Sequence, residues 1–331
     1  MGKEDKIWRS IIEIARRSPS THNTQGWKIA VVSPREAELL YDSERTLPAE
    51  DINGDFNIIN MGIFTRGAEI AAASMGYDLL YDFSMQPLHP PSRYTRIANL
   101  SLRNAVHAQS VSLLPLFLKR RTSRIPYDGR PINEEHVRVL QQSAHDRGHQ
   151  FSWTQNPEDV RRIMELNADT ISEDLQRGDV RNELHQWMRF TDREAREKGD
   201  GLWTRCMNQN SLLAWFTTIN PTLLQFGWIK RCARAYYLKT QSGTPAIGWI
   251  AGSIATRREQ FEAGRFFLDF WLELTRHGIW ILPYGSLYTN PASNKQIGEQ
   301  IGAPNFWLIF RMGYGATPPQ SFRLPTEELF L

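Results

Sequence analysis

The spacing of apolar residues predicts how the chain begins. Residues 7–17 place apolar side chains at helical intervals, and this helix must end before Pro19, because the residue that precedes a proline is disfavoured in the helical conformation. A polar stretch follows, and residues 27–32 then form a short β-rich run bounded by Ser33 and Pro34. The pattern therefore predicts a helix, a polar loop and a strand.

Two further helices are expected in the first third of the chain. One covers residues 34–40, with Ser33 as its cap. The other covers residues 60–75, which are rich in Ala, Ile and Met, and it ends at Gly76.

A faint internal repeat relates the second half of the chain to the first. Gly62 and Gly76 lie 14 residues apart, and so do Gly264 and Gly278, so that two predicted helices match in length. The stretch ahead of these helices, however, is 79 residues longer in the second half. We therefore predict two related halves, of which the second carries a large insertion.

The insertion is expected at about residues 170–255. Long insertions in compact folds are usually lids, binding walls or disordered linkers, and the aromatic content of this one argues against disorder. It contains Trp187, Trp203, Trp215, Trp228 and Trp249. We expect residues 1–110 and 111–331 to pack together as a fused pseudo-dimer, with the insertion as a helical, Trp-rich lid.

Composition and charge exclude several classes of function. The chain has 331 residues, and its 39 basic and 36 acidic side chains balance too evenly for a polyanion-binding protein. Two cysteines, Cys206 and Cys232, build neither a disulfide framework nor a zinc site, and we expect no metal. Because no apolar run is long enough for a membrane span or a signal segment, we expect a cytoplasmic protein without a nucleic-acid or membrane partner.

Three segments carry candidate chemistry. Residues 18–27 are rich in hydroxyl and amide groups, which suit the polar edge of a planar ligand, although a capped turn would have the same composition. Residues 119–124 hold three arginines and two hydroxyls, which suit a phosphate monoester or form a solvated basic turn. In residues 278–285, Gly and Pro bracket a strand end whose backbone can approach a ligand closely.

Together these segments resemble the nitroreductase-like flavoprotein family. In that family an Arg-x-Ser-x-basic turn, a C-terminal basic-x-Arg-Leu-Pro-like tail and a Pro-Ser-Ser-x-Asn-x-Gln-Pro-Trp loop surround FMN. Residues 120–124 match the turn with Thr in place of Ser, residues 19–27 match the loop with Gly26 in place of Pro, and residues 323–325 match the tail.

The resemblance implies an α+β fold of two sheets flanked by helices, and an FMN site. It implies that Arg120, Thr122 and Arg323 hold the ribityl and phosphate groups, and that Arg124 lies near the N1 and C2 carbonyl edge of the ring. The remaining residues that it places against the flavin are Ser20, Thr21, Asn23, Pro283, Tyr284 and Gly285. No catalytic side chain is assigned, and His22 is interpreted as a solvent-exposed spacer, with a substrate contact as the alternative.

The family is normally a homodimer with two flavins at its interface. In a fused chain, one complete set of motifs is present: the loop from the first half, and the arginine turn, strand end and tail from the second. The reciprocal site would need an arginine turn ahead of Ile7 and a polar loop at residues 143–151, and the sequence has neither. The resemblance to the Acg-like branch known from mycobacteria therefore implies one FMN per chain, in a monomer with an internal pseudo-two-fold or a weak homodimer.

The resemblance implies FMN-dependent oxidoreduction of a small, planar or aromatic molecule, with NAD(P)H or the substrate itself as electron donor. Two alternatives stay open at this point. One is a flavin-binding or flavin-storage protein whose lid prevents turnover, and the other is an interaction protein that keeps the fold without the flavin.

Overall fold

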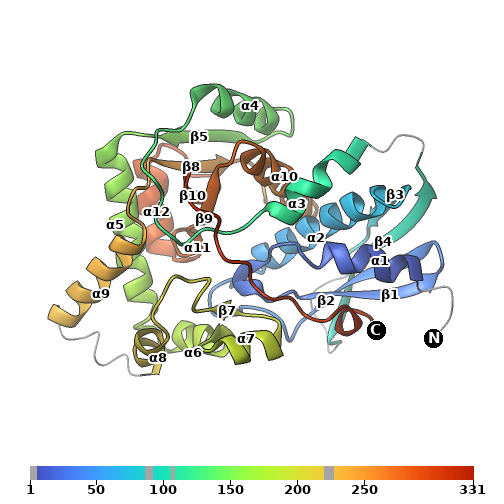
Figure 1. The fold of residues 1–331 in the computed structure, drawn as a ribbon, viewed down its shortest axis with the longest axis horizontal. Helices are drawn as coiled ribbons and strands as arrows, with labels where there is room; N and C mark the ends of the chain where they lie inside the picture. The colour runs from blue at the N-terminus through green and yellow to red at the C-terminus, as the bar shows by residue number, and fades with distance from the viewer. Residues whose placement is uncertain (1–5, 86–91, 106–108, 220–226) are drawn as a thin grey trace.

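Two four-stranded antiparallel sheets and the helices around them form an α+β fold (Figure 1). The computed structural model describes residues 6–85, 92–105, 109–219 and 227–331. The first sheet has the order β1-β2-β4-β3, from β1 (Trp27–Ser33), β2 (Glu36–Asp42), β3 (Tyr77–Phe83) and β4 (Tyr94–Asn104). The second has the order β5-β8-β10-β9, from β5 (Gln150–Thr154), β8 (Ala246–Ala251), β9 (Trp280–Pro283) and β10 (Phe306–Gly313).

The helices repeat in the same order as the strands. In each half one helix precedes the first strand and a longer one precedes the third: α1 (Lys6–Ala15) and α2 (Asp55–Ala73), then α4 (Glu134–His145) and α10 (Arg257–Arg276). The short α3 (Leu114–Lys119) leads into the second half, and α11 (Gly285–Thr289) and α12 (Pro291–Gln300) join β9 to β10. This correspondence confirms the internal repeat.

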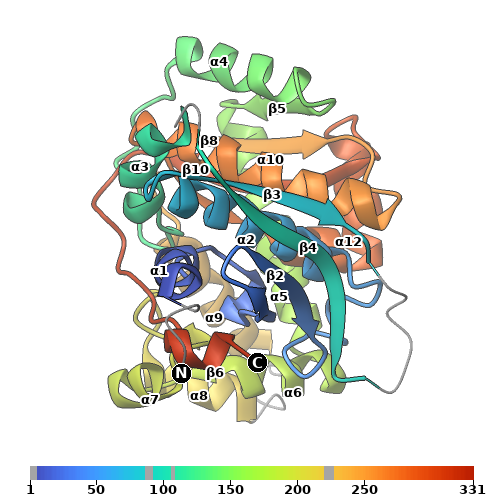
Figure 2. The same ribbon diagram turned by 90° about the vertical axis from the view of Figure 1, so that its right-hand side faces the viewer.

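Helices α2 and α10 pack side by side at the centre of the molecule (Figures 1 and 2). A Cβ atom on Gly62 would lie 1.9 Å from the carbonyl oxygen of Phe261, and one on Gly264 would lie 2.0 Å from that of Ile59. Gly62 follows Ile59 by three residues, and Gly264 follows Phe261 by three residues, so the two contacts are equivalent. The crossing is a reciprocal pseudo-two-fold contact, and it requires glycine at both positions because no side-chain atom fits between the backbones.

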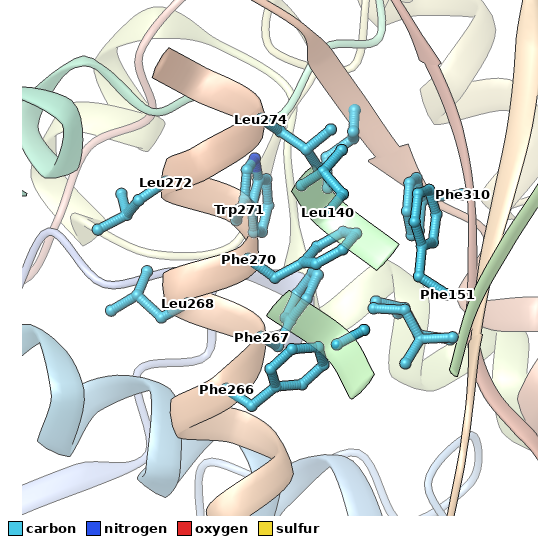
Figure 3. Close-up of a cluster of buried hydrophobic side chains, with 14 of the residues drawn as sticks. Leu140, Phe151, Phe266, Phe267, Leu268, Phe270, Trp271, Leu272, Leu274 and Phe310 are labelled. Carbon is cyan, nitrogen blue, oxygen red and sulfur yellow. The ribbon is translucent and has the colours of Figure 1, made fainter. Parts of the chain in front are cut away.

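Helix α10 also supplies much of the core of the second half. Figure 3 shows its aromatic side chains pointing toward the second sheet. The rings of Phe151 on β5 and Phe270 on α10 meet edge to face with centroids 4.9 Å apart, and Phe310 on β10 lies against the same ring. Helix α2 packs in the corresponding way against the first sheet, with Phe64 stacked on Trp27.

One predicted helix is wrong. Residues 34–40 were expected to be helical, but residues 34 and 35 form a turn and the chain continues as strand β2. The physical reason is an alternation with period two: Ala37, Leu39 and Tyr41 are buried against the core, whereas the residues between them are less buried. The predicted helix over residues 7–17 and the strand over 27–32 are confirmed as α1 and β1.

The insertion is a set of helices between β5 and β8, where the first sheet has only the turn between β1 and β2. We call residues 157–240 the lid. It contains α5 (Pro157–Asp174), α6 (Gly178–Trp187), α7 (Asp192–Lys198), α8 (Ser211–Ile219) and α9 (Gly227–Thr240), with the strand pair β6 (Met188–Arg189) and β7 (Leu202–Trp203). The expected bounds of 170–255 therefore cut through α5 and include β8, a strand of the second sheet.

The C-terminal tail returns from β10 to the first half of the chain (Figure 1). Phe330 forms an isolated parallel bridge with Ile29, and the N–H of Leu331 donates to the Ile29 carbonyl at 3.0 Å. The tail thereby links the two sheets. No helix within the described ranges is long and apolar enough to cross a bilayer.

We expect Gly62→Ala and Gly264→Ala each to lower the free energy of unfolding by about 3 kcal/mol or more, because each added methyl group meets a helix backbone that cannot move aside locally. Denaturant unfolding measures the effect. Gly178→Ala at the start of α6 is the matched control, since its nearest neighbour is the flexible end of Arg181 at 3.7 Å. Equal stability of all three variants would contradict the crossing.

Candidate functional site

Two adjoining pockets lie between the halves of the chain, beneath the lid. The larger has a volume of about 320 Å³ and the smaller one of about 80 Å³. They share Pro19, Ser20, His22, Thr122, Arg124, Leu202 and Met207. All ten residues that the sequence predicts for the cofactor line one pocket or the other: Ser20, Thr21, Asn23, Arg120, Thr122, Arg124, Pro283, Tyr284, Gly285 and Arg323.

The polar loop between α1 and β1 is backbone-strained. Its residues His22, Asn23 and Gln25 have φ angles of 49°, 57° and 53°, in the left-handed region that non-glycine residues rarely adopt. Such residues cost about 1–3 kcal/mol each and cluster at functional sites. The surrounding contacts must therefore hold the loop in place.

Contacts from three other parts of the chain hold this loop. Asn60 on α2 and Thr21 bond reciprocally, with the Thr21 N–H donating to the Asn60 amide oxygen at 3.3 Å. The Gln25 side chain donates to the carbonyl of Gly199 in the lid at 3.0 Å and accepts from the N–H of Leu324 in the tail at 3.0 Å. Loop, lid and tail thus form one hydrogen-bonded unit.

Asn23 has a structural role within the same unit. Its amide nitrogen donates to the carbonyls of Gly201 at 3.3 Å and Phe322 at 3.2 Å, so this donor is committed to the lid and the tail. The Ser20 hydroxyl accepts from the Gln25 N–H at 3.0 Å and keeps its own proton for a ligand.

Five arginines surround the smaller pocket. They are Arg17, Arg120, Arg121, Arg124 and Arg323. Among the ion pairs of the described residues, none involves any of these five side chains, and burial lowers the pKa of each. An unpaired cation in a desolvated place is costly, and an anionic ligand would offset that cost. The cluster is therefore built for a polyvalent anion.

Contacts of Arg120 fix the orientation of its guanidinium group. The residue is 5% exposed, and its guanidinium lies 4.5 Å from the ring centroid of Trp271 and donates to the Arg17 carbonyl at 3.2 Å. Burial and the nearby Arg323 hold its pKa well below the ordinary range, and burial lowers the pKa of Arg323 to about 10. Stacking on the indole fixes the plane of the guanidinium and leaves donors for the pocket.

The arginine turn is attached to the edge of the second sheet. Thr122 forms an isolated parallel bridge with Ile281 on β9, and the Ser123 N–H donates to the Ile281 carbonyl at 2.9 Å. Beneath it, the buried Arg311 donates to the Ser123 carbonyl at 3.2 Å and lies over the ring of Tyr127. Arg311 thus positions the turn rather than facing the ligand.

The end of β9 contributes backbone to the larger pocket. The Tyr284 N–H is used by the sheet, because it donates to the Ile309 carbonyl at 2.8 Å, and its hydroxyl donates to the Gln241 amide oxygen at 2.5 Å. Burial raises the pKa of Tyr284. The amide of Gly285 opens α11 and has no acceptor among the described hydrogen bonds, so it is the backbone donor available to a ligand at this edge.

The walls of the larger pocket differ from the sequence expectation. Its aromatic lining comes from three parts of the chain: Phe56 of the first half, Tyr237 of the lid, and Phe267, Trp271, Tyr284 and Trp307 elsewhere in the second half. The lid contributes mainly aliphatic and sulfur-containing side chains: Ile171, Leu175, Val180, Leu184, Met188, Leu202, Met207 and Ala214. Of the lid tryptophans, Trp203 lines the smaller pocket, and none lines the larger one.

A group of carboxyls lines the opposite wall of the larger pocket. Glu50, Asp51 and Asp174 border it, and Glu183 of α6 lies behind, accepting from the N–H groups of residues 49 and 50. Burial raises the pKa of Glu50 to about 8, with the Asp174 charge adding to the effect. Nothing in the sequence distinguished these acids from surface acids, because their burial depends on the lid.

His22 is not the exposed spacer that the sequence suggested. Its side chain is 17% exposed, lines both pockets, and places Nε2 3.3 Å from a carboxyl oxygen of Glu50. Burial, reinforced by the Arg124 charge, lowers its pKa to about 4. Both pKa shifts favour the uncharged forms, a protonated Glu50 carboxyl and a neutral His22 imidazole, because a charge on either group would be buried.

The sequence reasoning also missed the turn at residues 199–201. In the structure Gly199 and Gly201 adopt positive φ, and a Cβ on Gly201 would lie 2.3 Å from the Trp187 carbonyl. Between them, Asp200 accepts from Arg45 of the first half and Arg189 of the lid. The Gly-Asp-Gly spacing was the available signal.

The two pockets fit a ligand with a flat apolar body and a phosphate at one end. The large cavity is mostly apolar, the small one is cationic, and Thr122 and Arg124 lie where they meet. FMN, which the sequence resemblance implies, has this distribution of charge.

We expect the pKa of Glu50 to appear in the pH dependence of stability. A carboxyl whose pKa rises from 4.5 to about 8 on folding stabilises the protein fully below pH 4.5, and this contribution is lost as the pH rises through 8. Glu50→Gln stays neutral, so its free energy of unfolding should increase relative to wild type between pH 5 and 9, by up to about 5 kcal/mol.

Denaturant unfolding across this pH range is the measurement. Glu299→Gln, an exposed position on α12, is the matched control and should leave the pH dependence of the wild type unchanged. If the Glu50→Gln difference were constant with pH, Glu50 would not be desolvated in solution.

Comparisons with known proteins agree with the motifs around the pockets. No protein-family model matches the chain. A Mycobacterium tuberculosis protein named "Putative NAD(P)H nitroreductase Rv3131" is 28% identical over 125 residues, which is 38% of this chain and 35% of that protein. The "Uncharacterized protein Rv3127" of the same organism is 29% identical over 123 residues, 36% of this chain. The matches thus span about a third of the length of these relatives.

Solved structures of nitroreductases are also similar to the chain. The FMN-dependent nitroreductase NfnB from Mycobacterium smegmatis, in complex with NADPH, has a TM-score of 0.42 and 16% identity over 66% of this chain and 96% of its own. A structure from Anabaena variabilis described as a "putative nitroreductase" has a TM-score of 0.44 and 12% identity over 94% of this chain and 73% of its own. The chain is thus similar, over about a third of the length of its curated relatives, to a protein that is named as a nitroreductase.

Proposed function

We propose that this protein binds FMN and is an FMN-dependent oxidoreductase of the nitroreductase type. The observation that carries the proposal is the cluster of five arginines, which form no ion pair among the described residues and border a pocket adjoining the cavity lined by Trp271 and Trp307. The name of the relative Rv3131 and the FMN of the NfnB description support the same assignment.

The phosphate end of FMN would be held in the smaller pocket. Arg120 and Arg323 both donate to the Arg17 carbonyl, so their guanidinium groups are already oriented before a ligand arrives. Thr122 offers its hydroxyl at the junction of the pockets. These groups would bind a phosphate monoester with charge-assisted hydrogen bonds.

The ring end would occupy the larger pocket, where bound FMN supplies hydride and electron transfer. Arg124 would place a positive charge at one edge of the ring, and the Gly285 amide would offer a donor at another. Ser20, Thr21 and Asn23 would shape the contact from the first half. We assign no side chain the role of general acid.

One complete site per chain is part of the proposal. The polar loop comes from the first half, whereas the arginine turn, the β9 end and the tail come from the second. At the position in the second half that corresponds to the polar loop, α4 and β5 are joined by a short turn at residues 146–149. A monomer would therefore be sufficient for function.

The small volume of the larger pocket and its aromatic wall favour a small planar or aromatic substrate, with NAD(P)H or that substrate as electron donor. The absorbance spectrum of the protein mixed with FMN, followed by anaerobic addition of NADPH and then NADH, tests this. Bound flavin that bleaches within seconds supports the oxidoreductase. Bound flavin that persists with both donors and with candidate substrates would instead support flavin storage beneath the lid.

Replacing Arg120 and Arg124 together with Ala should weaken FMN binding by more than 100-fold, because each charge-assisted contact contributes about 1.5–3 kcal/mol. Fluorescence titration of FMN measures the affinity. Arg138→Ala on the exposed face of α4 is the control and should bind as wild type. Unchanged affinity in the double variant would show that the arginine turn is misassigned.

Flavin stoichiometry tests the single site. We expect one FMN per chain by native mass spectrometry and by absorbance against protein concentration. Two FMN molecules per chain would contradict the single site, because the reciprocal site would then also bind FMN although it lacks the arginine turn and the polar loop.

A further inference from the structure

The part of the lid that follows Asp200 carries positively charged side chains and no negatively charged ones. No Asp or Glu occurs between Asp200 and Glu259, in a chain that has 36 acidic residues in all. Within the lid, this stretch contains the basic residues Arg205, Lys230, Arg231, Arg234 and Lys239. Helices α8 and α9 lie within it, at the edge of the molecule and away from both sheets (Figure 1).

Large apolar side chains are exposed on these two helices. Trp228 on α9 is 65% exposed and Leu212 on α8 is 64% exposed. Tyr236, which follows Trp228 by eight residues on α9, is also exposed. Exposed tryptophan is rare on soluble surfaces, and Trp and Tyr are enriched where a protein meets the boundary between water and lipid.

Cations share this face of α9. Arg231 and Lys239 follow Trp228 and Tyr236 at an interval of three residues, are exposed, and form no ion pair within the described part of the chain. Arg234, by contrast, is turned to the protein and pairs with acids of α5. An exposed helix face that combines Trp and Tyr with unpaired Lys and Arg is typical of helices that lie in a membrane interface, whereas Lys is depleted in protein interfaces.

A recess adjoins both this face and the candidate site. It has a volume of about 110 Å³, lies among α5, α8 and α9, and includes Leu213, Lys230 and Tyr236 on its outer side. Six of its residues also line the larger pocket: Ile171, Leu175, Gln209, Ala214, Tyr237 and Thr240. The recess therefore shares a wall with the apolar cavity and lies on the side of the basic, Trp-bearing helices.

We propose that the exposed face of α8 and α9 docks peripherally on an anionic lipid bilayer. The proposal departs from the expectation of no membrane partner, which rested on the lack of a spanning segment and not on this surface. If the proposed function holds, the recess between the helices is the route by which an apolar molecule dissolved in the bilayer reaches the cavity.

Vesicle cosedimentation tests the docking independently of any flavin chemistry. The full chain should sediment with phosphatidylcholine vesicles that contain phosphatidylserine, should stay in solution with phosphatidylcholine alone, and should be released by high salt. Failure to sediment with the anionic vesicles at low salt would overturn the proposal, whether or not the protein binds FMN.

Variants locate the surface. Arg231→Gln should weaken vesicle binding about fivefold, as expected for one basic residue at an anionic surface, and Trp228→Ala should weaken it further. Arg138→Gln and Ile52→Ala, exposed outside the lid, are the controls and should bind as wild type.

Thermal unfolding and FMN affinity of the same variants show that they are folded, because neither Trp228 nor Arg231 lines a pocket. Equal binding of wild type and both lid variants would overturn the assignment. So would a wild-type dimer in size-exclusion chromatography that Trp228→Ala converts to monomer, since the face would then be an interface between two copies.

Discussion

The close packing of α2 on α10 is the constraint on which the rest of the structure depends. Gly62 and Gly264 let the two helix backbones meet, and each helix carries the apolar residues of one sheet, so the distance between the sheets is set by this crossing. Both pockets lie between the halves that the crossing holds together, and Asn60 on α2 and Trp271 on α10 line the larger one. A wider crossing would separate the polar loop from the arginine turn and thereby divide the site.

A second constraint acts on the loops. Three left-handed residues in the polar loop are unfavourable by themselves, and the loop keeps this shape because Gln25 and Asn23 bond to the lid and the tail. The turn at residues 199–201 can make these contacts only because its glycines allow the backbones to approach. Lid, loop and tail are therefore coupled, and a ligand held by the Arg323 side chain in the tail would also stabilise the closed arrangement of the lid.

Much of the fold and of the candidate site could be predicted from the sequence, since helix lengths, glycine stops and short motifs are local signals. The strand β2 was mistaken for a helix because Pro34 opens either element, and only the alternating burial of Ala37 and Leu39 distinguishes them. The acidity of the larger pocket was not predictable, because Glu50 becomes buried only when the lid from the other half covers it. The same holds for His22, whose partner is 28 residues away in sequence.

The core of the repeat is symmetric whereas its loops are not. The first half has a strained polar loop where the second has a short turn whose left-handed residue is Gly148, and the second half has the lid where the first has the turn before β2. The polar loop of the first half and the lid of the second half line the same two pockets. The helix crossing uses glycines and apolar residues that belong to neither loop nor lid. A change in the loop or the lid therefore leaves the residues that make the crossing itself in place, and loops on such a scaffold can vary while the core is kept.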